Sequence, residues 1–264
     1  MNETSRAALV RRGTTASVVL FVVFLVAWEW GPGLLGIPQF IIPPLSLVYK
    51  EFFRMVGVNQ LFFHTGVTTA EVLIGFAIGS LLGAFIGYLL GISPTAEFAL
   101  SPYILALQIA PKVAFAPLFI LWMGFTVYPK ILVAILIVFF PVMVNVLTAV
   151  RTVDPDLINL ARSFKATRAQ IFWKIEFPES LPAMFAGLRI GATLAVVGVV
   201  VGELVGGNLG LGYLLVVGEG QANTPMVFVC ILMLTLIGSV AYLAVILVEM
   251  RVLHYLPSRS FTAY

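Results

Sequence analysis

Long apolar segments alternate with short polar connections along the whole of this 264-residue chain. A helix needs about 20 mainly apolar residues to cross the hydrocarbon layer of a bilayer. The segments that meet this requirement lie at residues 16–36, 66–91, 97–123, 129–150, 180–202 and 226–250. The pattern therefore predicts an all-α integral membrane protein with six transmembrane helices.

Prolines and glycines interrupt this pattern at defined places. The third segment contains Pro102, Pro111 and Pro117, which predicts a kink or break near Pro111. Residues 41–55 follow two prolines and predict a short amphipathic helix outside the membrane, with Ser46 as its N-cap. The glycine-rich residues 203–225 predict a flexible external connection or a re-entrant turn.

A second glycine pattern lies inside an apolar segment. Glycine recurs at a spacing of four residues through the second segment, at Gly75, Gly79, Gly83, Gly87 and Gly91. Such a ladder lines one helix face and lets another helix approach closely. It predicts tight helix packing but does not identify the partner helix, or whether that helix belongs to a second copy.

Composition agrees with a membrane protein and excludes several other classes. Charged residues make up 10% of the chain and hydrophobic residues 61%, whereas soluble domains carry about 25% charged residues. The small net charge of +3 gives no sign of nucleic-acid binding. Cys230 is the single cysteine, so no intramolecular disulfide or cysteine metal cluster forms. His64 and His254 have no neighbours at metal-ligand spacing, and no nucleotide-binding P-loop occurs.

Basic residues are distributed unevenly between the two sides of the membrane. They gather in the N-terminal tail, in the loop at residues 151–180 and in the C-terminal tail, while the opposite side carries Lys50, Arg54 and Lys130. The positive-inside rule then places both termini and the 151–180 loop in the cytoplasm. The predicted organisation is a cytoplasmic tail at 1–15, a six-helix transmembrane domain at 16–250 and a second cytoplasmic tail at 251–264.

The 151–180 loop is basic and patterned. Leu157, Leu160, Ala161 and Phe164 repeat at helical spacing, which predicts an amphipathic helix pair. Such a loop has three options: it lies on the membrane surface, packs on its own bundle, or docks into a partner.

Residues within this loop match a known motif. Asn159, Ala161, Lys165, Ile175 and Pro178 fall at the spacing of E-A-A-x3-G-x9-I-x-L-P. The chain thereby resembles the transmembrane permease subunits of ABC importers, in which this motif marks the cytoplasmic coupling loop. The family's leading Glu, second Ala, Gly and Leu are replaced here by the residues Asn159, Leu160, Lys165 and Phe177. The missing glycine implies that Lys165 adopts a less favourable backbone conformation or that the turn differs.

Further segments extend the resemblance over residues 40–250. IIPPLSLV, APLFILWMGF, FFPVMVN, VDPDLINLARSF and GLRIGATLAVVGVVVGEL are all similar to the nitrate/sulfonate/taurine branch of the family. The AVVGVVVGEL variant is more similar to members for riboflavin or pyrimidine vitamin precursors than to sulfonate members.

The resemblance implies a fold, partners and a mechanism. It implies a type I ABC importer permease in the bacterial inner membrane, and a homodimer surrounded by lipid. Each copy would dock one cytoplasmic ATPase, and ATP and Mg would be bound by the ATPase rather than by this chain. A solute-binding protein would deliver the solute from outside, and transport would proceed by alternating access. The residues implied in ATPase coupling are Asn159, Leu160, Ala161, Ser163, Phe164 and Lys165.

Polar residues within the predicted spans are candidates for the translocation pathway, because they are costly in a membrane. These candidates are Gln108, Lys112, Asn145, Arg189 and Glu203. Each has a structural alternative. Lys112 attracts a polar or anionic solute, or it reaches an interface or satisfies carbonyls freed at the break. Arg189 lines the pathway, or it reaches the cytoplasmic face or forms an ion pair within the bundle.

The remaining candidates have alternatives of the same kind. Glu203 forms part of an outer gate, meets the binding protein, or marks a solvated helix end. Gln108 and Asn145 line the pathway or form hydrogen bonds between helices. Glu71 and His64 are predicted to have ordinary interface positions near the outer end of the second segment.

Two classes of function remain after this reasoning. The first is the transmembrane subunit of an ATP-driven importer for a nitrate-, sulfonate- or taurine-like anion, or for riboflavin or a pyrimidine vitamin precursor. The second is a self-sufficient secondary transporter or channel, for which coupling ions, inverted repeats and intramembrane carboxylates are expected. A membrane-embedded enzyme is not supported, since no catalytic constellation of Ser, His and Asp occurs.

Overall fold

A computed structural model of the chain describes residues 3–254, with side chains from Arg12 onward. Within these residues, the helices long and apolar enough to cross a membrane are Arg12–Leu34, Leu61–Gly91, Tyr128–Thr152, Arg168–Gly206 and Thr224–Val252. A bent pair, Pro94–Ile109 and Lys112–Met123, is a sixth candidate span. The described part of the chain is thus an all-α bundle with the span order that the sequence predicts.

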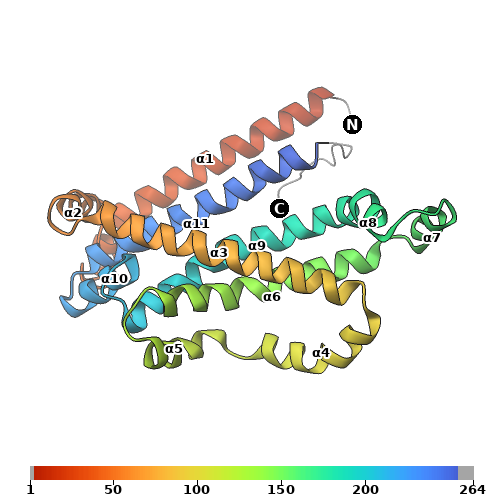
Figure 1. The fold of residues 1–264 in the computed structure, drawn as a ribbon. Coiled ribbons are helices and arrows are strands. Elements are labelled where there is room, and N and C mark those ends of the chain that lie inside the picture. The colour runs from red at the N-terminus through yellow and green to blue at the C-terminus, as the bar shows by residue number, and fades with distance from the viewer. Residues whose placement is uncertain (1–2, 255–264) are drawn as a thin grey trace. The chain divides into compact units, whose positions relative to one another are not determined.

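The chain divides into two compact units, which are described separately. One consists of the residues up to Phe62 together with Leu214–Leu232, and the other of Phe63–Tyr213 together with the residues from Met233 on. The first unit contains α1 (Glu3–Leu34), α2 (Leu45–Val58), most of α10 (Leu211–Gly220) and the start of α11 (Thr224–Val252). Figure 1 labels these elements in chain order.

The predicted amphipathic helix outside the spans is present as α2, but its start differs from the prediction. The N-cap position is Pro44, which provides no side-chain cap, so the assignment of Ser46 as the cap was wrong. Instead, the Ser46 backbone N–H donates a 2.8 Å hydrogen bond to Oε2 of Glu29. A carboxylate from α1 therefore satisfies a free N–H group in the first turn of α2.

Glu51 of α2 is the main polar anchor of the first unit. Its Oε1 accepts a 2.8 Å hydrogen bond from Nδ2 of Asn223, and its Oε2 accepts a 2.7 Å hydrogen bond from Nε of Arg54. Burial alone would raise the pKa of Glu51, but the hydrogen bonds from Arg54 and Asn223 outweigh burial and hold this pKa below its ordinary value. Glu51 therefore stays ionised at neutral pH and ties α2 to the turn before α11.

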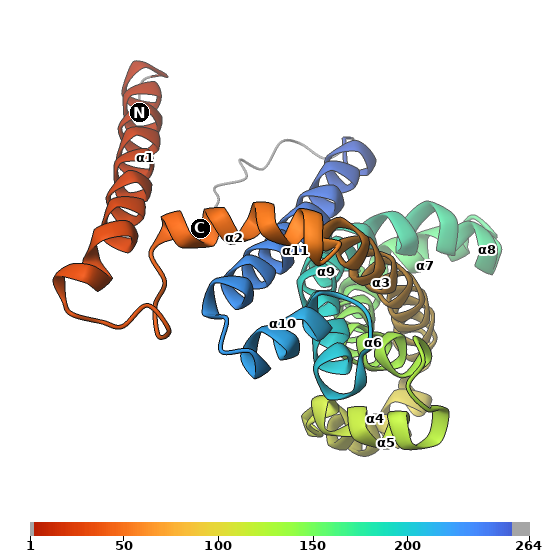
Figure 2. The same ribbon diagram turned by 90° about the vertical axis from the view of Figure 1, so that its left-hand side faces the viewer.

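The core of the second unit is α6 (Tyr128–Thr152), which lies between α3 (Leu61–Gly91) and α9 (Phe177–Gly206). Figures 1 and 2 both show these three helices running side by side. The glycine ladder of α3 faces α6: a Cβ on Gly83 would lie 2.7 Å from the carbonyl oxygen of Phe139. The prediction of tight packing is confirmed, and the partner is α6 of the same chain.

A second row of glycines on α9 approaches the other side of α6. A Cβ on Gly198 would lie 2.6 Å from Cα of Ala134, and one on Gly202 would lie 2.7 Å from Cα of Lys130. Side chains at these positions would force the helices apart. The glycines of α3 and α9 let both helices pack closely on α6. This close packing explains why residues of α6 are buried along its length, from Pro129 to Val150.

The third predicted span is broken, as the sequence indicates. It consists of α4 (Pro94–Ile109), a 3₁₀ turn η1 (Lys112–Phe115) and α5 (Ala116–Met123), with a bend of 80°. α5 packs into the core through Ala116 and Phe119, whereas α4 contains no buried residue. Arg151 at the end of α6 forms an ion pair with Glu97, which ties the start of α4 to the bundle.

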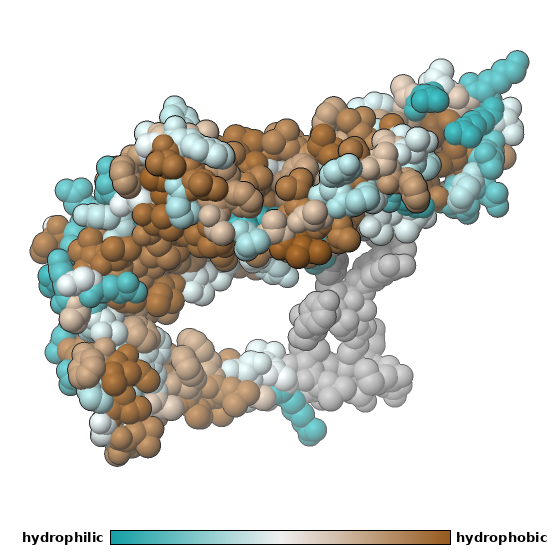
Figure 3. Space-filling model, turned by 90° about the horizontal axis from the view of Figure 1, so that it is seen from below, coloured by the Kyte–Doolittle hydropathy of each residue, from teal (hydrophilic) through white to brown (hydrophobic). Residues whose placement is uncertain are grey.

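The glycine-rich residues 203–225 are not a simple flexible connection. Ten of them form α10 (Leu211–Gly220), so the prediction of a flexible segment was wrong for this part. Figure 3 shows one face of the molecule, which is largely apolar, with hydrophilic residues gathered mainly towards its two ends. Large exposed hydrophobic side chains along the spans, such as Leu81 and Leu105, are expected where lipid is the solvent.

Candidate functional site

The 151–180 loop carries a short exposed helix, α7 (Pro155–Ser163). The helix begins at an N-cap, Asp154, whose Oδ1 accepts a 2.8 Å hydrogen bond from the Asp156 N–H. It has no buried residue. Its apolar face is open: Leu160 is 56% exposed and Phe164, at the C-cap, is 79% exposed. All six residues predicted for ATPase coupling lie on α7 or in the turn that ends it.

That turn is a Schellman motif with a lysine in the position usually taken by glycine. The Lys165 N–H donates to the Arg162 carbonyl at 2.8 Å, and the Ala166 N–H donates to the Ala161 carbonyl at 3.0 Å. Lys165 adopts a φ of 58°, in the left-handed region. The expectation that Lys165 takes a less favourable conformation is therefore confirmed.

Replacing this lysine with glycine should strengthen the turn. A non-glycine residue in the left-handed region costs on the order of 1 kcal/mol, so Lys165→Gly should stabilise the end of α7 by up to about 1 kcal/mol. Hydrogen–deuterium exchange at the amides of residues 165 and 166 should slow several-fold. Arg162→Gly, inside the same helix, should have the opposite effect, and equal exchange in both variants would contradict this account.

The second half of the loop, after α7, is anchored to the helices of the second unit, whereas α7 is not. α8 (Arg168–Ile171) begins with a capping box in which Thr167 and Gln170 exchange hydrogen bonds. It continues into a π-helical segment, η2 (Phe172–Glu176), and directly into α9. The Tyr88 hydroxyl of α3 donates to Oε2 of Glu176 at 3.1 Å, and the Tyr88 ring packs against Phe172.

The loop therefore has a free helix joined to a fixed one. In Figure 1, α7 lies at the tip of the second unit, beyond the end of α6. Since α8, η2 and α9 form one continuous helical path, a force applied to α7 reaches α9 through very few flexible residues. This arrangement suits the transmission of rigid-body movement.

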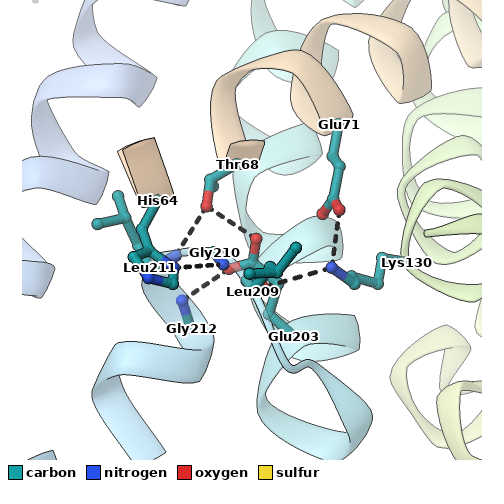
Figure 4. A network of polar contacts seen from close by, with 9 residues as sticks. All are labelled: His64, Thr68, Glu71, Lys130, Glu203, Leu209, Gly210, Leu211 and Gly212. Carbon is teal, nitrogen blue, oxygen red and sulfur yellow. Dashed lines mark hydrogen bonds and ion pairs between the residues drawn. The ribbon is translucent and has the colours of Figure 1, made fainter. Parts of the chain in front are cut away.

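A buried polar network lies near the other end of the same helices (Figure 4). Its centre is Glu203 of α9, which is 1% exposed. Oε1 of Glu203 accepts a 2.7 Å hydrogen bond from the Thr68 hydroxyl, and Oε2 accepts a 2.6 Å hydrogen bond from the Gly212 N–H. The suggestion that Glu203 marks a solvated helix end was therefore wrong, because its carboxylate is buried and fully engaged.

An ion pair forms the second part of this network. Nζ of Lys130, on α6, donates to Oε1 of Glu71 at 2.7 Å, and both side chains are buried. Oε2 of Glu71 is buried and has no hydrogen-bond partner in the described part of the chain. Lys130 also donates to the Leu209 carbonyl at 3.4 Å. The ion pair thus joins α3, α6 and the segment that leads into α10.

His64 completes the network on α3. Its Nδ1 accepts a 3.0 Å hydrogen bond from the Gly210 N–H, and its ring stacks on Tyr213. Gly210 has a φ of 106° and lies against the Glu203 carboxylate, where a side chain has no room. The prediction of interface positions for His64 and Glu71 was wrong, since both are buried.

Sequence reasoning missed this network, although one signal for it exists. His64, Thr68 and Glu71 precede Gly75 at spacings of three or four residues, so they extend the glycine stripe that packs on α6. The face of α3 that carries the glycines is buried, and the same face continues one or two turns towards the start of the helix. The burial of His64, Thr68 and Glu71 was therefore predictable.

Lys112 lies at the break of the third span. Its Nζ donates to the Gln108 carbonyl at 2.6 Å and lies 4.7 Å from the centre of the Phe140 ring. It therefore satisfies a carbonyl that the end of α4 leaves free, as one of the two sequence interpretations expects. The side chain of Asn145 donates to the Pro141 carbonyl of its own helix at 2.8 Å.

Arg189 forms an ion pair within the bundle. Its Nε lies 3.5 Å from Oε2 of Glu249 on α11, and the Glu249 side chain is buried. The alternative in which Arg189 takes part in an ion pair is confirmed. Among the five pathway candidates, the structure shows a direct contact between Lys112 and Gln108.

Comparison with known proteins agrees with this architecture. Residues 75–254 match the family described as "Binding-protein-dependent transport system inner membrane component". The riboflavin transport system permease protein RibX of Chloroflexus aurantiacus is 38% identical over 88% of this chain and 86% of its own length. The formylaminopyrimidine transport permease protein ThiX of Halalkalibacterium halodurans is 33% identical over 86% of this chain and 90% of its own length.

A solved structure shares the fold. An inward-facing form of the MetNI methionine ABC transporter superposes on 73% of this chain and 95% of its own, with a TM-score of 0.62 and 19% sequence identity. The fold and the sequence together define a multi-pass membrane permease. The chain belongs to the binding-protein-dependent transport system inner membrane components, which are permease subunits of ABC importers.

Proposed function

We propose that this chain is the transmembrane subunit of an ATP-driven importer and that α7 is the element on which the ATPase acts. The observation that carries the proposal is the exposure of Leu160 and Phe164 at a helix that has no buried residue. Apolar side chains on a polar loop outside the spans are typical of a protein contact surface.

The partners follow from this assignment. Two copies of the chain form the transport path, and each docks one cytoplasmic ABC ATPase that binds ATP and Mg. An extracytoplasmic solute-binding protein delivers the solute. Both termini and the 151–180 loop then face the cytoplasm, in agreement with the distribution of basic residues.

The solute is a small molecule of the kind named for the relatives. We favour a riboflavin-like or pyrimidine-like compound over an inorganic anion. Lys112 and Arg189, the two basic pathway candidates, are each engaged within the bundle, by the Gln108 carbonyl and by Glu249. Arg189 thus has a carboxylate as its counter-charge, whereas the Lys112 ammonium is held at the end of α4 by a neutral carbonyl.

Purification of the tagged permease from its native membrane tests the assembly. We expect an ABC ATPase to co-purify at one copy per permease, and uptake into vesicles that contain the complex and the binding protein to require ATP. A permease that purifies without an ATPase and transports without ATP would be a secondary carrier, and the proposal would be wrong.

A further inference from the structure

A groove lies between α9 and α11 in the second unit. It has a volume of about 550 Å³ and is lined by Thr193, Thr235, Gly238, Ser239, Tyr242 and Leu243. This volume lies within the range of about 300–1,000 Å³ that is usual for small-molecule sites. Thr193 and Ser239 each lie near the middle of their helix, so the groove opens at the depth of the bilayer interior.

Hydroxyl groups are unusually frequent in this groove. The Thr193 hydroxyl donates to the Ile190 carbonyl at 2.9 Å, which leaves its oxygen able to accept. The hydroxyls of Ser239 and Tyr242 form no hydrogen bond with any described residue. An unpaired hydroxyl is costly in hydrocarbon, and tyrosine normally lies at the membrane interface rather than at mid-span. The groove therefore offers a few hydroxyl groups within a mainly apolar lining, as small-molecule sites usually do.

The groove carries no charged side chain. The nearest charge along α9 is Arg189, one turn before Thr193, and it is paired with Glu249. An anion in the groove would thus lose its hydration without gaining a counter-charge. An uncharged solute does not incur this cost, and the hydroxyls offer it both donors and acceptors.

The shape of the lining favours a flat solute. Gly238 has no side chain to fill the space beside Val196 of α9, and Tyr242 is one of the residues that line the groove. An aromatic ring stacks on a planar heterocycle, whose edge atoms then face the hydroxyls.

We propose that this groove is a contact site in the transport path for an uncharged, planar heteroaromatic solute with several hydrogen-bonding groups. The inference rests on the proposed function, because it assigns a solute site to the same permease. It identifies Thr193, Ser239 and Tyr242 as the residues that contact the solute.

Thiol labelling tests the proposal, because the single native cysteine, Cys230, is buried. Ser239→Cys is placed in the permease–ATPase complex in lipid nanodiscs and treated with a charged, water-soluble thiol reagent. Val240→Cys, at the same depth but at an exposed apolar position that does not line the groove, is the matched control. We expect the cysteine at 239 to react and the cysteine at 240 to remain unlabelled.

Protection from labelling then identifies the class of solute. Riboflavin, as a planar uncharged probe, should slow labelling at position 239 at least five-fold, whereas nitrate should not. Tyr242→Phe in the same background should weaken the protection while labelling without riboflavin stays unchanged. Thr193→Cys, on the opposite wall, provides an independent readout if Ser239→Cys purifies poorly.

Two results would overturn the assignment. A cysteine at 239 that stays unlabelled shows that lipid or a helix of a second copy covers the groove. Labelling that riboflavin does not slow, or that nitrate slows equally, shows that the solute class is wrong. A failure of the proposed function is seen separately, as the absence of the ATPase from the purified complex.

Discussion

Lys130→Met should destabilise the permease strongly. The substitution leaves Glu71 buried without its cation and close to a second buried carboxylate, Glu203. Removing one partner of a buried ion pair costs about 3–5 kcal/mol, because the remaining charge stays uncompensated. We expect a thermal unfolding midpoint that is lower by several degrees in detergent, together with a reduced yield of monodisperse protein.

A second substitution separates the ion pair from other effects of the methionine. Combining Lys130→Met with Glu71→Leu removes both charges, and replacing a buried ion pair with apolar residues is often close to neutral. The double variant should therefore recover most of the lost stability, and a double-mutant cycle measures the coupling. Arg54→Met breaks an ion pair with an exposed arginine and should cost less than about 1 kcal/mol. Equal losses for Lys130→Met and Arg54→Met would contradict the structural role of Lys130.

The position of this network gives it a consequence for transport. Glu203 lies near the C-terminal end of α9, whereas the loop that carries α7 joins the other end of the same helix. The network fixes the segment from Leu209 to Gly212 to α6, α3 and α9. If α9 moves from the end that joins the α7 loop, the segment from Leu209 to Gly212 should move with it, because the hydrogen bonds hold this segment to α9.

Regular patterns were readable from the sequence, whereas irregular contacts were not. The six spans, the break near Pro111 and the tight packing of the glycine stripe all follow from spacing alone. The α3–α6 pairing and the contact between Glu71 and Lys130 depend on the rotation of two helices about their axes. A single sequence indicates which residues lie on the same face of a helix, but it does not indicate which helix packs against that face.

The errors have a common physical cause. Ser46, Glu71 and Glu203 were interpreted by residue type and by distance from a span end, which predicts caps, interface positions and solvated helix ends. In the structure each of these positions meets a group that is distant in sequence: Glu29 for Ser46, Lys130 for Glu71 and Thr68 for Glu203. Local propensity is overridden wherever burial and a distant hydrogen-bond partner are available.

Phe164→Asp should release the ATPase while leaving the bundle folded. Phe164 is 79% exposed and packs on no core cluster of the described residues, so its loss removes little from the fold. In the docked complex, the aspartate would place an unpaired charge in an apolar contact. A cost of about 3 kcal/mol corresponds to a loss of affinity of more than a hundred-fold.

Co-purification and thermal unfolding measured on the same samples test this prediction. Phe164→Leu keeps an apolar side chain at this position and should retain the ATPase, while both variants should unfold at the temperature of the unaltered protein. Loss of the ATPase together with a lower unfolding temperature would indicate damage to the bundle instead. If Phe164→Asp retains the ATPase at normal yield, the docking surface lies elsewhere on the loop, and the exposed apolar face of α7 has another role. The selective result, loss with aspartate and retention with leucine, would place the contact on this face, because leucine keeps an apolar side chain there whereas aspartate introduces a charge.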